Sequence, residues 1–275
     1  NNMLKRAVTW NGGTERPGVL NGARHIVLGG STAYVTTDVG IVIVDLAAPL
    51  KPKLTAVVSL PGARASALQF RYLFVLDSNG MRVIDVTVPG KPRLADATVT
   101  LADARRIYVA RTYAYVAAGR EGLAIIDVEQ PEAPRLLTRY TAESRLNDAR
   151  DVIVGSTNAS LFAYVADGIN GLKVVQLTAP DTQPKFYGFS PEPRPRLIAW
   201  RKTASPALSL SKGLDRDRAV DETGGQIAVF GRIGSRPFTL PEMQRLYLRP
   251  DNSVWSVTDE VRQQDFVPAP RREVR

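Results

Sequence analysis

The sequence predicts an all-β fold of the β-propeller type, and a recurring pattern is the basis of that prediction. Four stretches each run from a glycine through a hydrophobic strand and a polar residue to a turn that ends in proline: Gly40–Pro52, Gly80–Pro92, Gly122–Pro134 and Gly171–Pro184. Two shorter blocks precede each stretch in the same order, so the whole unit recurs about every 40 residues. A period of that size, with about four short strands per unit, is typical of a propeller blade.

Each block of the unit reads as a strand or a turn. The first block starts with an Ala-Arg pair, and the second contains an aromatic or aliphatic residue followed by valine. In the third unit we expect strands at 106–110, 113–117, 123–128 and 136–140. The β-branched pair Ile125-Ile126 suits a packed sheet, and Pro131 and Pro134 end the strand because proline cannot donate to a ladder.

The rest of the chain divides around these repeats. We expect residues 1–20 to be a leader or a strand that closes the propeller, 21–189 to hold four repeats, and 190–225 to be an irregular, proline-rich, basic segment. Residues 226–275 are expected to form a strand, a short helix at 240–248 and another strand, completing or extending the propeller. This organisation predicts about five blades, or an open part of a larger propeller.

The repeat resembles the LVIVD-repeat family, over residues 23–189. The resemblance rests on segments such as Asp148–Val154, Tyr164–Gly168 and Leu123–Pro134, whereas Ser66 and Gln176 depart from the pattern. It implies a β-propeller in an exported or cell-surface protein of a bacterium or archaeon, at times associated with multihaem cytochromes. It implies no particular reaction.

Composition excludes several kinds of site. The chain has no cysteine, so it cannot form a disulfide, a zinc–cysteine site or a covalent c-type haem attachment. His25 is the only histidine, which excludes multi-histidine metal sites and bis-histidine haem ligation within the chain. No apolar run approaches the length of a membrane span. These observations predict no metal and no cofactor.

The charge predicts the kind of partner. The formal net charge is +9 and the isoelectric point is about 9.9, which favours acidic partners. The basic residues are dispersed over the repeats without interleaved aromatic residues, which disfavours nucleic-acid binding.

The candidate site residues are the arginines of the repeated Ala-Arg pairs. These are Arg24, Arg64, Arg105 and Arg150. Around an axis they could form an anion site or a docking surface for an acidic partner. They could instead pair between blades, with neighbouring carbonyls or with the residues that close the third strand of each unit. Those residues are Asp45, Asp85, Asp127 and Gln176. Because Gln176 carries no charge, its seam is the first place to look for a ligand.

No catalytic constellation is recognisable. The chain contains no G-x-S-x-G motif, no P-loop and no dinucleotide-binding fingerprint. The expected function is therefore that of a non-catalytic scaffold or protein-interaction subunit of the cell envelope or surface, for example an accessory to a multihaem cytochrome assembly. The alternatives are a small-ligand or glycan-binding propeller that uses a central arginine-lined pocket, and an enzyme with an axial active site.

Overall fold

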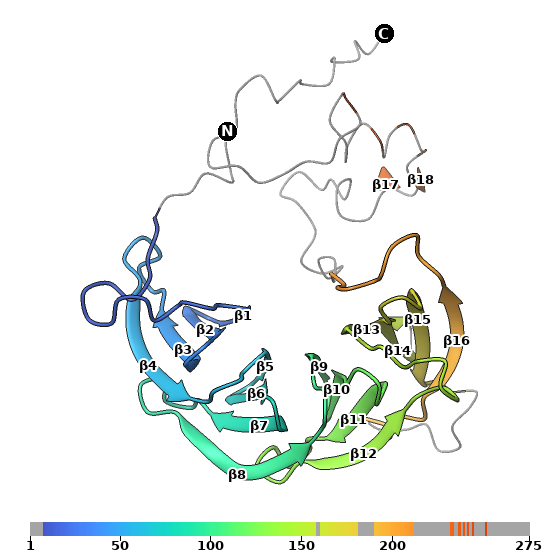
Figure 1. Ribbon diagram of the computed structural model, residues 1–275, viewed down its shortest axis with the longest axis horizontal. Helices are drawn as coiled ribbons and strands as arrows, with labels where there is room; N and C mark the ends of the chain where they lie inside the picture. The colour runs from blue at the N-terminus through green and yellow to red at the C-terminus, as the bar shows by residue number, and fades with distance from the viewer. Residues whose placement is uncertain are drawn as a thin grey trace. The chain divides into compact units, whose positions relative to one another are not determined.

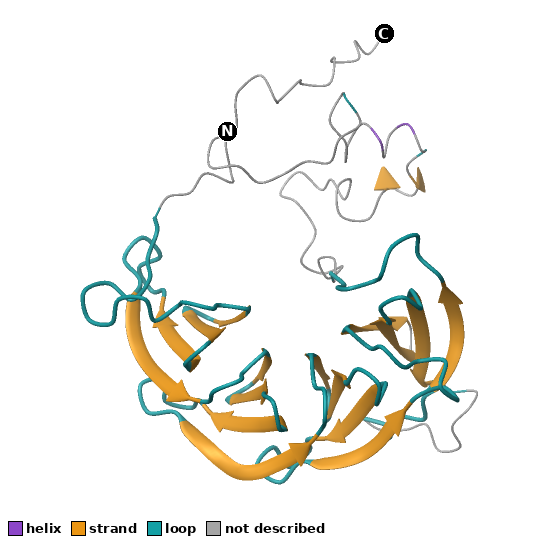
Figure 2. Ribbon diagram, viewed as in Figure 1, coloured by secondary structure: helices purple, strands orange, loops and turns teal. Residues whose placement is uncertain are grey.

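The computed structural model describes residues 8–157, 160–180 and 190–211, together with positions 232–233, 236–237, 239, 241, 244 and 251 (Figure 2). The chain separates into two compact units. Residues 10–211 form one of them, and residues 1–9 with 212–275 form the other. Within the described residues no helix is long and apolar enough to cross a membrane.

The unit of residues 10–211 contains four sheets, each made of four antiparallel strands in sequential order (Figure 1). The innermost strands are β1 (His25–Gly29), β5 (Ala65–Gln69), β9 (Arg106–Ala110) and β13 (Asp151–Thr157). The second strands are β2 (Thr32–Thr37), β6 (Tyr72–Leu76), β10 (Tyr113–Ala117) and β14 (Ser160–Ala166). The third strands are β3 (Gly40–Asp45), β7 (Gly80–Asp85), β11 (Leu123–Asp127) and β15 (Leu172–Thr178). The outer strands are β4 (Lys53–Ser59), β8 (Arg93–Thr100), β12 (Arg135–Tyr140) and β16 (Arg196–Arg201). The predicted four-stranded, propeller-type blades are therefore confirmed.

The strands of a sheet differ in burial as their sequences predict. In the first three sheets the second and third strands are buried along most of their length, as in β3 and β6, whereas β14 and β15 of the fourth sheet alternate between buried and half-buried residues. The outer strand β12 alternates between exposed and half-buried residues. In every sheet the pairing of the third and outer strands has a register shift, for example between Ile125 and Ile126. Such a bulge bends the outer strand and increases its twist.

The hydrophobic core is divided among the seams between successive sheets. The innermost strands β1, β5, β9 and β13 lie next to one another in that order, and the sheets fan out from them (Figure 1). Each seam holds one apolar cluster, such as Phe74, Met81 and Val83 of the second sheet against Val116 and Ile126 of the third. Each sheet is thus stabilised mainly by the sheets on its two sides.

The two ends of the repeat region differ from the prediction in detail. The outer strand of the fourth sheet is 196–201, which lies inside the segment predicted to be irregular. At the other end, Trp10, Val19 and Leu20 pack on the outward face of the first sheet, so residues from the predicted leader cover part of that face.

Most of the predicted C-terminal elements lie outside the described residues. Of the strand expected at 226–233, only Arg232–Ile233 (β17) is described, paired with Arg236–Pro237 (β18). The helix expected at 240–248, the strand expected at 253–258 and the fifth blade they were to form fall outside the described ranges, apart from isolated positions. The closing strand expected at the N-terminus also lies outside the described residues, except for its last residues, 8–10.

Candidate functional site

The four arginines of the Ala-Arg pairs occupy equivalent positions. Each directly precedes the innermost strand of its sheet, and its backbone N–H donates to a carbonyl near the end of the second strand. These bonds are Arg24 to Thr36, Arg64 to Leu76, Arg105 to Ala117 and Arg150 to Ala166. The repeat therefore brings all four arginines to the same rim of the fan.

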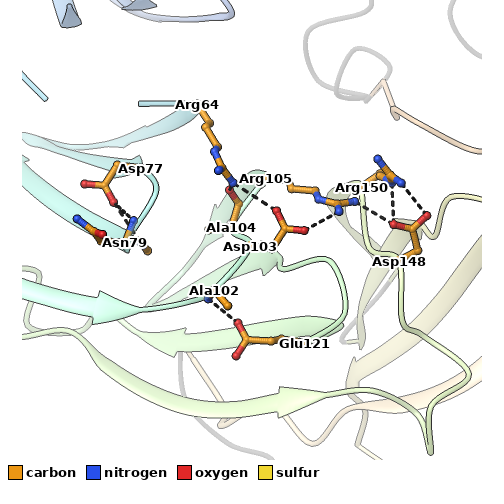
Figure 3. A network of polar contacts seen from close by, with 11 residues as sticks. Arg64, Asp77, Asn79, Ala102, Asp103, Ala104, Arg105, Glu121, Asp148 and Arg150 are labelled. Carbon is orange, nitrogen blue, oxygen red and sulfur yellow. Dashed lines mark hydrogen bonds and ion pairs between the residues drawn. The ribbon is translucent and has the colours of Figure 1, made fainter. Parts of the chain in front are cut away.

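Three of these arginines form a ladder with two aspartates that alternate with them (Figure 3). Arg64 Nη1 lies 3.3 Å from Asp103 Oδ1, and Arg105 Nη2 lies 2.5 Å from Asp103 Oδ2. Arg105 Nη1 also lies 3.0 Å from Asp148 Oδ1, which in turn is 2.8 Å from Arg150 Nε. Arg24 stands apart and pairs with Asp38 in its own sheet.

The ladder crosses the seams between sheets. Arg64 reaches from the second sheet to the segment that enters the third, where it also donates to the carbonyl of Ala104 at 3.2 Å. Arg105 reaches from the third sheet to Asp148, which precedes the fourth. Burial by itself would raise the pKa of Asp148, but the hydrogen bonds from Arg150 and Arg105 outweigh it and lower that pKa. The arrangement makes these charges inter-blade ties.

The expectation that these arginines pair with Asp45, Asp85 or Asp127 is wrong. Those aspartates sit at the far end of the third strand, five residues from the glycine that starts it, so about 16 Å of strand separates them from the ladder rim.

The repeated acids instead close turns within their own sheets. Each accepts a hydrogen bond from the backbone N–H two residues on, at Ala47, Thr87 and Glu129. Arg93 and Arg135 on the outer strands then pair with Asp85 and Asp127. Gln176 keeps the same role without charge, because Arg196 Nη2 donates to its Oε1 at 3.0 Å.

A depression of about 450 Å³ lies beside the ladder. Its lining includes the ladder residues Asp103, Arg105, Asp148 and Arg150, together with Glu121. Glu121 accepts from the backbone of Ala102 and pairs with Arg139. The charges that line this depression are therefore largely taken up by one another.

The opposite rim carries a residue that the sequence analysis missed. Phe70 is 92% exposed and occupies the two-residue turn between β5 and β6 with a φ of 52°. The first sheet has Gly30 at this position and the third has Arg111, both also with positive φ. The signal in the sequence was an aromatic residue standing where the first repeat has glycine.

A cluster of polar contacts surrounds this turn. The guanidinium of Arg71 lies 5.0 Å from the centre of the Tyr72 ring and donates to the Tyr72 hydroxyl at 2.7 Å. That hydroxyl donates to Glu132 of the third sheet at 3.2 Å. Gln69 donates to the carbonyl of Arg111 at 2.8 Å, which ties the turn to its neighbour.

His25 lies at the start of β1 and has a structural partner. Its Nδ1 accepts from the backbone N–H of Ser66 at 3.3 Å. Burial and the charge of Arg106 lower the pKa of His25, against an opposing effect of Asp151. Among the described side chains, no group of three or more His, Asp or Glu residues could hold a metal ion.

Comparison with known proteins identifies the repeat. A family model described as the LVIVD repeat matches residues 22–59, 102–142 and 148–181. No curated protein matches the chain by sequence.

Solved structures resemble this chain at low sequence identity. A protein of unknown function from Desulfotomaculum acetoxidans superposes with a TM-score of 0.50 at 12% identity, over 74% of this chain and 63% of its own. Hsv2 from Kluyveromyces lactis gives a TM-score of 0.43 at 14% identity, over 70% of this chain and 54% of its own. This chain therefore covers less than two thirds of the length of each of these two solved structures. Together, the family match and the four repeated sheets show that residues 22–181 carry LVIVD repeats in a fold of the β-propeller type.

Proposed function

We propose that this chain is a non-catalytic interaction module, and that it binds an acidic protein partner through the hairpin turn at Phe70. The observation that carries the proposal is the combination of exposure and backbone conformation at that residue. A left-handed conformation is unfavourable for a bulky side chain, and a phenylalanine with its ring in water gains nothing from burial. Such outliers concentrate at functional positions.

The surroundings of Phe70 suit protein recognition. Aromatic and arginine side chains dominate the energetics of protein interfaces, and here Arg71 and Tyr72 follow Phe70 directly. The bonds from Tyr72 to Glu132 and from Gln69 to Arg111 hold the turn in place before any partner arrives, which lowers the entropy lost on binding. The net charge of +9 favours an acidic partner and speeds its approach.

The family resemblance supports a more specific setting. By that resemblance we expect such a propeller outside the cytoplasm, in the periplasm or at the cell surface, and at times beside multihaem cytochromes. We therefore propose an envelope subunit whose acidic partner belongs to an electron-transfer assembly.

The two alternative functions have less support. A ligand site built on the repeated arginines requires arginines without carboxylate partners, yet Arg24, Arg64, Arg105 and Arg150 each pair with an aspartate. An axial enzyme requires converging groups with functional pKa shifts. Pairing and burial explain the shifts of Asp148 and His25 without a reaction.

Replacing Phe70 with glycine tests the proposal. The chain is first isolated from its source at low salt, and its partner is identified by mass spectrometry and visible absorption. Affinity for that purified partner is then measured for wild type, Phe70→Gly and Leu50→Ala, the last removing an exposed apolar side chain elsewhere. We expect Phe70→Gly to weaken binding at least 30-fold, with unchanged or increased thermal stability because glycine accepts the turn conformation.

Two results would contradict this function. One is a complex that Phe70→Gly leaves as tight as the wild type. The other is a chain that remains a partner-free monomer at low salt.

A further inference from the structure

A second depression, of about 480 Å³, lies at the edge of the fourth sheet, in the unit of residues 10–211. Trp200 of β16 and Lys173 of β15 line it, together with the loop residues 169–170 and 202–206. Trp200 and Lys173 are direct cross-strand partners, so their side chains share one face of the sheet. Trp200 is 60% exposed, whereas Lys173 is only 6% exposed.

Lys173 is a buried cation whose carboxylate partner among the described residues is distant. Its Nζ lies 3.9 Å from Asp167 Oδ2, which is beyond hydrogen-bonding distance, and that oxygen accepts no hydrogen bond from the described residues. The other carboxylate oxygen of Asp167 accepts from the backbone N–H groups of Asn147 and Asp148. A buried ammonium ordinarily has hydrogen-bond partners for its protons, so this one has capacity for a further acceptor.

A cation at this position is not common to all four sheets. The residue two after the starting glycine of the third strand is the apolar Val42 in the first sheet and Ala124 in the third. The second sheet has Arg82 there, 4.0 Å from Asp77, so a cation beside an aspartate recurs. What sets the fourth sheet apart is the cross-strand partner of that cation, which is Thr98 for Arg82 but the largely exposed Trp200 for Lys173.

We propose that this depression binds an acidic saccharide. The sugar ring would lie against the indole of Trp200, whose flat apolar surface complements the C–H groups of a pyranose. The carboxylate of the sugar would accept from Lys173, with Lys202 adding positive charge at the edge. Asn170, Thr203 and Ser205 supply amide and hydroxyl groups for the sugar hydroxyls. A cavity of this volume is within the range of small-molecule sites.

Titration calorimetry with matched small molecules tests the ligand class. The probes are glucuronate and galacturonate, glucose as a ring without a carboxylate, and acetate as a carboxylate without a ring. We expect at least one uronate to bind at least tenfold more tightly than glucose and acetate. Equal binding of glucose or of acetate, or no binding of either uronate, would overturn the proposal.

Variants locate the site. Trp200→Ala is expected to weaken uronate binding at least tenfold. The double variant Lys173→Met with Asp167→Asn removes the ammonium without leaving a buried carboxylate unpaired, and keeps an oxygen for the amides of Asn147 and Asp148. It should reduce uronate affinity to that of glucose.

Phe70→Gly is the matched control, because Phe70 lies on a turn of the second sheet that is not part of this depression. It should leave uronate binding unchanged, which separates this site from the proposed partner surface. If Trp200→Ala and the double variant both bind uronate like the wild type, the site is wrong even if uronate binds.

Discussion

At the scale of single residues, the ladder shows how a repeat makes use of charge. Arg105 is the central rung, because it contacts an aspartate on each side and its side chain is 25% exposed. Surface ion pairs contribute little, but removing this partly buried arginine takes one cation from each of two carboxylates, leaving Asp103 with Arg64 and Asp148 with Arg150.

We predict that Arg105→Met lowers the free energy of unfolding by about 1–2 kcal/mol, an intermediate value because the pair is only partly buried. Arg135→Met is the control, since Arg135 also pairs with an aspartate but its side chain is 79% exposed. Its loss should change stability by less than about 0.5 kcal/mol. Chemical denaturation of the three proteins measures both effects, and equal losses would show that the ladder is no more than a surface feature.

The single histidine gives the chain a defined pH response. Because the pKa of His25 is lower in the folded protein than its ordinary value of 6.5, protonation favours the unfolded state. Well above pH 6.5 the histidine is neutral in both states and does not reduce the free energy of unfolding. As the pH falls below 6.5, the unfolded state binds the proton more readily and the free energy of unfolding decreases. The pKa of Asp148 is also lowered, but its contribution is lost only below about pH 4.

We therefore predict that the wild type loses stability between pH 7.5 and pH 5, and that His25→Gln loses less over the same range. Burial raises the pKa of Asp167, which acts in the opposite direction, but it does so equally in both proteins. Thermal melts at the two pH values measure the difference. Parallel changes in the two proteins would mean that folding does not lower the pKa of His25.

The sequence indicated the arginines of the ladder but not their partners. Asp103 and Asp148 stand two residues before Arg105 and Arg150, whereas the first two repeats have glycine there. The partner acids were sought among the repeated aspartates, because co-occurrence in a repeat suggested pairing. Sequence periodicity says nothing about the direction of a strand, and it is the length of the third strand that separates these groups.

At the scale of elements, the outer strand of the fourth sheet shows why one boundary was misplaced. Every outer strand begins directly after a proline with a basic residue followed by leucine. These starts are Lys53-Leu54, Arg93-Leu94, Arg135-Leu136 and Arg196-Leu197. In the fourth repeat Pro184 resembled the closing proline, while the true equivalent is Pro195.

The start of an outer strand can be predicted where a side-chain contact accompanies it, whereas the turn at Phe70 could not be predicted. In the second, third and fourth repeats the basic residue after the proline contacts the polar residue near the end of the third strand, even where Gln176 replaces aspartate. Residues 190–195, which the structure describes directly before the outer strand of the fourth sheet, form no strand themselves. The turn at Phe70 was missed because a phenylalanine gives no turn signal, and glycine would have been expected there.

At the scale of the whole repeat region, stability depends on the seams. A leucine stands three residues before the alanine of each Ala-Arg pair and is buried or half-buried in an apolar cluster. These leucines are Leu20, Leu60, Leu101 and Leu146. Leu60 lies in the cluster between the first and second sheets, and Leu146 lies in the cluster between the third and fourth. The repeat thus supplies one comparable probe for each seam.

We predict that Leu146→Ala weakens the seam between the third and fourth sheets in preference to the others. Leu146 is fully buried, so its truncation should lower stability by about 2–4 kcal/mol. Hydrogen exchange followed by mass spectrometry should show faster exchange in β13–β16 and in β10 and β11, with little change in β1–β4. Leu60→Ala is the matched variant and should produce the opposite distribution, because its seam joins the first two sheets. In a solenoid-like array each unit depends mainly on its neighbours, which is why the effect should stay local. If each variant instead accelerates exchange equally in all four sheets, the repeat region unfolds as one cooperative unit. The ion pairs of the ladder, which cross two of the seams, would then explain how the sheets are coupled.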